Sequence, residues 1–390
     1  MTNKISITRN LIIGLGGAGV RSVLKAKAEC FDNWFKIPRQ IQFAMIDTDV
    51  LPSELPKFTD PEINFVDDFL YLKVNNPNYF VKTFDEIGSS IPTNNRHLLD
   101  PFFIGAGQVR SRGRFVFAVN YFQIRNYLRK KIGMITDFYE DEKFNFDESN
   151  IIHIAVITSF AGGTGAGMFV DMQYLIREIA DELRIKIYLK LIFILPEVYQ
   201  GLPSTRLINI NTYASLMECE LLSGVFFDKS FQKIKENGLD LPYVEATRKI
   251  NHDDQFYDIF IPVDKFNDVI IDNVGQLTDF IGRQLFITMV NVGGMAKSSL
   301  NNANCEIKAK NQMGGVEGKL FYRMNGMEYS DTIQYPAPFN ALINIEKYAD
   351  EYQNKYLNEL KNGTNSSSVI SPFITQQIED AIMESGFSFV

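Results

Sequence analysis

The chain has 390 residues, a formal net charge of −8 and a sequence pI of about 5.2, and 45% of its residues are hydrophobic. This size predicts a soluble globular protein of two closely joined domains, and the acidic balance argues against a nucleic-acid binder with a broad basic face. The three cysteines and three histidines are scattered, which argues against a disulfide framework, a zinc site or a His-centred triad. No apolar run approaches the roughly 20 residues that span a bilayer. We therefore expect a cytoplasmic protein.

The first predicted elements are a short apolar strand from Asn10, a glycine turn and a helix that carries Val20, Val23 and Leu24. The turn has the form Gly14-x-Gly16-x-x-Gly19, which taken alone is the dinucleotide fingerprint of an NAD-binding Rossmann unit. An NAD-dependent oxidoreductase is therefore one interpretation of this segment.

A second strand is predicted from Gln40 to Ile46, and it ends in Asp47-Thr48-Asp49. An acid at the carboxyl end of a strand can accept a ribose hydroxyl or hold the water shell of a magnesium ion. An ordinary acidic turn explains the same three residues.

Residues 51 to 98 are rich in Pro, Asn and Asp and predict irregular surface structure. A further glycine turn follows at Gly105-Ala106-Gly107, before three arginines on alternate positions and a helix from about Phe115 to Lys131. Alternate arginines cannot all face one phosphate. One or two of them could neutralise it, whereas the others would be solvated or would pair with acids.

The most informative motif is the glycine-rich stretch from Ser159 to Gly167, Ser-Phe-Ala-Gly-Gly-Thr-Gly-Ala-Gly. It follows an apolar strand from Ile151 to Ile157 and precedes a helix from Met168 to Leu183. Glycines allow positive φ and close approach of a ligand to the backbone, and the free amides of a first helical turn favour an anion such as phosphate. The alternative is a tight turn that lets the helix pack close to the sheet.

Strands and helices continue to alternate through the long apolar-striped helix predicted at Asn273 to Val292, which indicates a mostly parallel Rossmann-like α/β sheet with helices on both faces. Ligands of such sheets bind at the carboxyl ends of the strands, where all three glycine turns fall. Residues 294–390 depart from this pattern. One or two strands are expected between Lys319 and Pro336, a helix from Ala341 to Leu360, and a flexible linker near 361–371.

Taken in order, the loops resemble those of the tubulin and FtsZ superfamily of GTP-binding proteins, as a divergent bacterial tubulin-like member. The segment from Ala161 to Gly167 resembles the family signature that clasps the phosphates, and the loops at 14–19, 47–49 and 105–107 resemble the first three nucleotide loops. The resemblance covers roughly residues 8 to 292. It implies a GTP-binding domain at 1–272, a central helix at 273–293 and a reduced or atypical C-terminal domain at 294–390.

The resemblance also implies the ligand and its contacts. The ligand would be GTP or GDP with Mg²⁺ beside Asp47, with Gly107 and Gln108 at the γ-phosphate, and with Arg206 and Asn211 near the ribose. Val263 occupies the position at which FtsZ-like members place the base-binding Asn, so Asn267 and Asn273 are the nearest substitutes. The remaining implied contacts are Ala18 and, on the phosphates, Gly16, Gly17, Gly162, Gly163, Thr164, Gly165 and Ala166.

Family members hydrolyse GTP when an acidic loop after the central helix of one subunit meets the nucleotide of the next. Residues 291–304 contain no Asp or Glu, and Glu306, the first acid beyond them, is a weak candidate for this catalytic role. The resemblance therefore predicts a nucleotide-dependent, head-to-tail filament with weak GTP hydrolysis at most. The alternatives are the oxidoreductase and a tubulin-fold scaffold without turnover. The expected partner is a second copy of the chain, and the sequence does not identify an adaptor protein.

Overall fold

The structure is a computed structural model, and it describes residues 4–50, 66–84, 105–137, 140–146, 151–199, 208–222, 238–250, 257–264, 271, 273–289, 321–328 and 337–344. The predicted positions Arg206, Asn267 and Glu306 and the predicted linker at 361–371 lie outside these residues.

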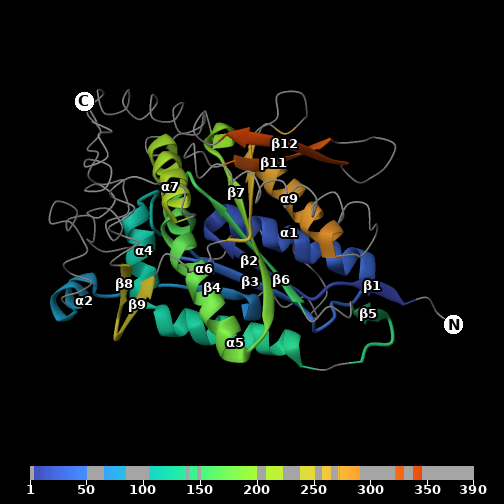
Figure 1. Ribbon diagram of the computed structural model, residues 1–390, viewed down its shortest axis with the longest axis horizontal. Coiled ribbons are helices and arrows are strands. Elements are labelled where there is room, and N and C mark those ends of the chain that lie inside the picture. Colours follow the sequence, from blue (N-terminus) through green and yellow to red (C-terminus); the bar gives the residue numbers. More distant parts are fainter. Residues whose placement is uncertain are drawn as a thin grey trace.

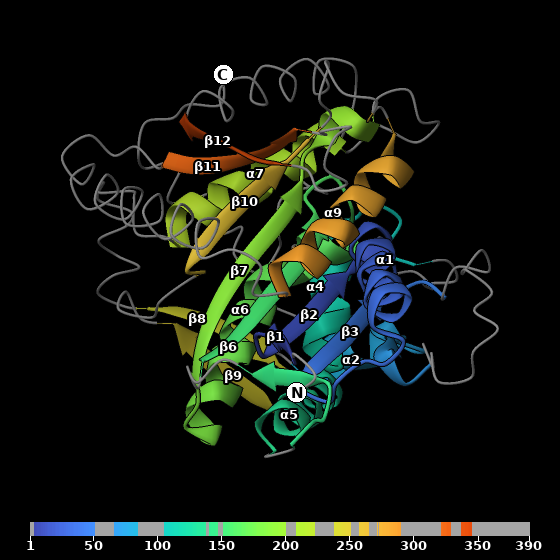
Figure 2. The same ribbon diagram turned by 90° about the vertical axis from the view of Figure 1, so that its right-hand side faces the viewer.

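A six-stranded sheet forms the centre of the fold (Figure 1), and Figure 2 labels its edge strand β10. Every neighbouring pair is parallel, and the strand order is β10-β7-β6-β2-β3-β4. The strands are β2 (Asn10–Leu15), β3 (Ile41–Asp47), β4 (Phe69–Tyr71), β6 (Ile151–Ser159), β7 (Lys186–Ile194) and β10 (Ile259–Val263). All residues of β2 and β3 are buried, as expected for parallel strands covered on both faces. The predicted α/β fold class is confirmed.

Helices cover both faces of the sheet. On one face lie α1 (Gly16–Trp34) and α9 (Val274–Met289), which Figure 2 shows side by side. On the other face lie α4 (Arg110–Val119), α5 (Tyr121–Thr136) and α6 (Thr164–Leu183). The helix α7 (Ile208–Leu222) packs against α6.

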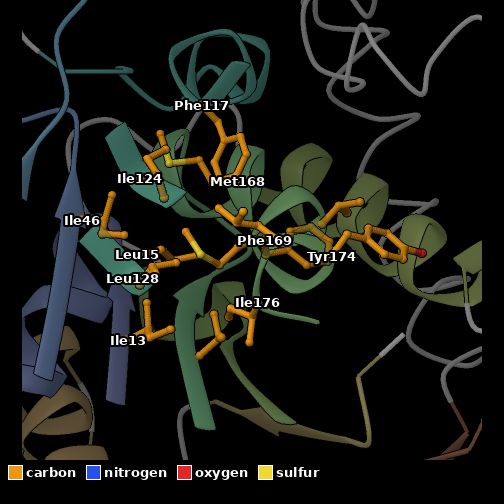
Figure 3. Close-up of a cluster of buried hydrophobic side chains, with 14 of the residues drawn as sticks. Ile13, Leu15, Ile46, Phe117, Ile124, Leu128, Met168, Phe169, Tyr174 and Ile176 are labelled. Atoms are coloured by element: carbon orange, nitrogen blue, oxygen red, sulfur yellow. The ribbon is translucent and has the colours of Figure 1, made fainter. Parts of the chain in front are cut away.

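Alternate side chains of the central strands enter two separate cores, because successive residues of a strand point to opposite faces. Leu11, Ile13 and Leu15 of β2 join the core beneath α4, α5 and α6, whereas Ile12 joins the core beneath α1 and α9. Figure 3 shows the first of these cores, where Ile13 and Leu15 meet side chains of α4, α5 and α6.

The order of the strands places a switch point between β2 and β6. From β2 the chain passes through α1 to β3 on one side, and from β6 it passes through α6 to β7 on the other side. The helices that follow two neighbouring strands therefore lie on opposite faces. A crevice outside the carboxyl ends of two such strands is the usual ligand site of an open α/β sheet.

Smaller elements complete the described part of the chain. An antiparallel hairpin of β8 (Leu239–Tyr243) and β9 (Ala246–Ile250) lies beside α4. The others are the parallel pair β1 (Ile5–Ile7) and β5 (Phe144–Phe146), the antiparallel pair β11 (Phe321–Glu328) and β12 (Ala337–Asn344), the helix α2 (Pro77–Thr83), and two 3₁₀ turns, η1 (Val66–Asp68) and η3 (Pro196–Tyr199).

The structure corrects three local expectations. The predicted helix from about 115 is two helices, which break at Asn120, where the backbone has φ −102° and ψ 17° and the side-chain amide donates to Val116 O. Residues 66–84, expected to be irregular, contain β4 and α2. The helix expected from Ala341 does not begin there, because β12 continues to Asn344.

Candidate functional site

The first turns of α1 and α6 meet at the carboxyl ends of β2 and β6. A Cβ atom on Gly16 would lie 3.2 Å from Gly165 N, so the two helix starts are in van der Waals contact. The residues before the helices are Leu15 and Gly163, and neither provides a side-chain capping bond. Because the first amides of a helix have no partner within the helix, two sets of donors and two positive dipole ends converge here.

Most of the glycines in these turns are required by close packing. A Cβ on Gly19 would lie 2.4 Å from Ile157 O, one on Gly165 would lie 2.7 Å from Leu15 O, and one on Gly167 would lie 2.2 Å from Arg110 O. In the same turns, a Cβ on Gly14 or Gly163 would also lie too close to a neighbouring atom. The tight-turn interpretation of the signature therefore holds for these positions.

Two further glycines have no neighbour that excludes a side chain. The atom nearest to a Cβ on Gly17 would be Asp47 Oδ2 at 4.0 Å, and the atom nearest to a Cβ on Gly162 would be Ser159 O at 3.8 Å. Neither residue has a positive φ. Packing and backbone conformation leave these two glycines unexplained, whereas a ligand lying against the bare backbone would require them.

The loop at 105–109 borders the same edge. Gly107 and Gln108 have φ values of +56° and +61°, and Gly107 is exposed. Ala106 N donates to Thr48 Oγ1 at 2.9 Å, and Thr48 Oγ1 lies 2.6 Å from Thr164 Oγ1. The Thr48 hydroxyl thus joins three loops that are far apart in the sequence, and sequence reasoning gave it no role of its own.

Asp47 is a largely buried carboxylate beside these turns, with 7% of its surface exposed. Its Oδ1 accepts hydrogen bonds from Thr48 N at 2.7 Å and from Asp49 N at 3.3 Å. Burial raises the pKa of Asp47 to about 6, although the two amides act in the opposite direction. Near neutral pH the group is mostly ionised and has the charge and oxygen ligands that Mg²⁺ prefers.

Two of the three arginines after this loop pair with acids inside the protein. Arg110 is buried, forms an ion pair with Glu218 of α7, and donates from Nε to Ala166 O at 3.2 Å. Arg114 Nε lies 2.6 Å from Asp171 Oδ2 of α6. The expectation that some arginines pair with acids is confirmed, but their partners could not be identified from the sequence.

The structure describes two of the residues that were predicted to contact the sugar and the base. Asn211 is fully buried on α7, and its Nδ2 lies 2.8 Å from Gln108 O, 3.1 Å from Ala161 O and 3.3 Å from Gly162 O. Asn273 Oδ1 accepts from Gln276 N at 3.0 Å and so caps α9. Contact of either residue with a nucleotide stays a prediction.

Within the described ranges, no helix has the length and apolar character needed to cross a membrane, and no group of three or more His, Cys, Asp or Glu residues could hold a metal ion. A cation at the glycine turns would therefore need ligands from the nucleotide and water in addition to Asp47.

The fold and this edge define a doubly wound α/β protein with a candidate anion site at the switch point of its sheet. The sequence matches the family described as tubulin-like over residues 11–335, and the chain therefore belongs to this tubulin-like family. The resemblance to the tubulin and FtsZ superfamily is thereby confirmed.

Two solved structures are similar to this chain. CetZ2 from Haloferax volcanii, in a GTPγS-bound protofilament, is 13% identical over 75% of this chain and 62% of its own, with a TM-score of 0.39. CetZ from Methanosaeta thermophila is 17% identical over 77% of this chain and 59% of its own, with a TM-score of 0.42. The chain thus spans about three fifths of each of these proteins. No curated protein matches it.

Proposed function

We propose that this protein binds a guanine nucleotide, GTP or GDP, at the carboxyl edge of β2 and β6. The observation that carries the proposal is the meeting of two uncapped helix starts beside Gly17 and Gly162, whose missing side chains packing does not explain. Membership of the tubulin-like family favours GTP over NAD as the ligand.

The proposed contacts combine this geometry with those that the family resemblance implies. The amides of Gly16, Gly17 and Ala18 would bind the phosphates from α1, and those from Gly162 to Ala166 would bind them from α6. Gly107 and Gln108 would face the γ-phosphate, and Asp47 would hold Mg²⁺ or its water shell. Arg206 would lie near the ribose, and Asn267 would take part in contact with the base.

We further infer that the bound nucleotide promotes head-to-tail association of identical subunits. Such a contact joins two different surfaces and produces filaments when the rotation does not close a ring. Since residues 291–304 supply no acid to activate water, hydrolysis should be slow, and the nucleotide should act mainly as a structural switch.

The test is to denature the purified protein and identify the nucleotide that it releases by chromatography and mass spectrometry, before and after incubation with GTP, ATP and NAD. Release of GTP or GDP in a ratio near one nucleotide per chain is the expected result. Analytical ultracentrifugation of the same samples should show larger species with GTPγS than with GDP. Release of NAD alone would support the oxidoreductase, and release of no nucleotide under any condition would support a scaffold.

A further inference from the structure

One buried side chain contacts both loops of the candidate site. The Nδ2 atom of Asn211 is within 3.3 Å of three carbonyl oxygens, that of Gln108 in the loop at 105–109 and those of Ala161 and Gly162 in the signature turn. An amide nitrogen has only two hydrogens, so the three carbonyls share two donors. Asn211 is 0% exposed, so its amide contacts these loops from the interior of the protein.

These bonds orient the peptide groups that precede α6. In a trans peptide the C=O and the following N–H point in opposite directions, and the described residues contain no cis peptide bond. The carbonyls of Ala161 and Gly162 point toward Asn211 on α7. The amides of Gly162 and Gly163 therefore point away from α7 and toward the opposite side of the turn, where the proposed phosphates would lie.

A second polar link joins α7 to the same two loops. Glu218 lies about two turns beyond Asn211, on the same face of α7, and forms an ion pair with Arg110 at the start of α4. The Arg110 guanidinium also donates to Ala166 O in the first turn of α6, at 3.2 Å from Nε and at 3.1 Å from Nη2. Two residues of α7 thus hold the starts of α4 and α6 together.

We propose that Asn211 is a positioning residue that sets the spacing between the loop at 105–109 and the signature turn, so that the site distinguishes a nucleoside triphosphate from a diphosphate. This inference rests on the proposed function, in which the loop at 105–109 contacts only the terminal phosphate. Without the Asn211 amide, that loop loses a link to the signature turn at Gln108, and the terminal phosphate loses contacts that a diphosphate never makes.

The test measures the dissociation constants of GTPγS and of GDP for the full chain and for the variants N211A and N211S, together with their thermal stability. The matched control is T212V. Thr212 is equally buried on the neighbouring position of α7, but its hydroxyl donates only within the helix, to Ile208 O at 2.8 Å.

For N211A we expect about tenfold weaker binding of GTPγS and at most about threefold weaker binding of GDP, which corresponds to the loss of roughly one net hydrogen bond at the terminal phosphate. N211S keeps one donor and should fall between N211A and the wild type. T212V should bind both nucleotides as the wild type does. The ratio of the two constants is the decisive readout, because a purely structural role for Asn211 would change stability and leave the ratio unchanged.

An unchanged ratio in N211A, whether both affinities are kept or both fall equally, would overturn this inference while leaving the proposed function intact. Failure of the wild type to bind either nucleotide would overturn both. If N211A does not fold, the ratio measured for N211S decides the question by the same criterion.

Discussion

The two classes of glycine in the signature turn should separate binding from stability. Gly162 and Gly165 are three residues apart, yet a Cβ would be 3.8 Å from the nearest atom at Gly162 and 2.0 Å from Thr158 Oγ1 at Gly165. G162A should therefore keep or slightly raise the free energy of unfolding, by about 0.4–1 kcal/mol, because alanine restricts the unfolded chain more than glycine does. G165A should lower it by about 1–3 kcal/mol, because Leu15 O at 2.7 Å cannot move without its strand.

The effect on binding should be the reverse of the effect on stability. A methyl group on Gly162 occupies the surface on which we place the phosphates, so G162A should bind GTPγS at least tenfold more weakly, a loss of about 1.4 kcal/mol. Urea unfolding and titration with a fluorescent GTPγS analogue measure the two quantities on the same samples. Binding of GTPγS by G162A as tight as that of the wild type, or unfolding of G162A as easy as that of G165A, would contradict this division of the glycines.

Further predictions concern buried charges and helix packing. Because the pKa of Asp47 is about 6 when folded and 3.8 in its ordinary state, its contribution to stability is fully present below pH 3.8 and is lost as the pH rises through 6. Relative to D47N, the unliganded wild type should lose about 2 kcal/mol between pH 4 and pH 7 in urea unfolding. R114M leaves Asp171 buried without its cation and should cost about 3–5 kcal/mol, part of which R114M/D171L should recover. A Cβ on Gly282 would lie 2.5 Å from a side-chain carbon of α1, so G282A should lower stability by about 1–3 kcal/mol in unfolding followed by the fluorescence of Trp34, the chain's single tryptophan.

Local patterns were sufficient to predict the main elements of the fold. The apolar run from Ile151 to Ile157 and the similar runs at β2, β3 and β7 are long enough to identify buried parallel strands, and the glycine turns identify the edge at which ligands bind. β4 was missed, because a strand of three residues has too little periodicity to be recognised.

Local sequence patterns could not predict contacts between distant segments. The sequence placed Asn211 near the ribose and Arg110 among three arginines that could neutralise a phosphate, and it gave Thr48 no role of its own. Only the fold identifies their partners, which lie 103 to 116 positions away in the chain. The same holds for the division of the glycines into packed and open positions, because it depends on how closely two helices approach two strands. The domain boundaries stay a prediction, because residues 290–320 lie outside the described part of the chain.

Isothermal titration of the nucleotide-free protein with GTP, GDP, ATP and NAD, each with Mg²⁺, measures directly whether the chain binds a guanine nucleotide. We expect one site per chain that binds GTP and GDP at least tenfold more tightly than ATP or NAD, and that is weakened in G162A. Tight binding of NAD without binding of GTP, or equal binding of GTP by G162A and the wild type, would contradict it.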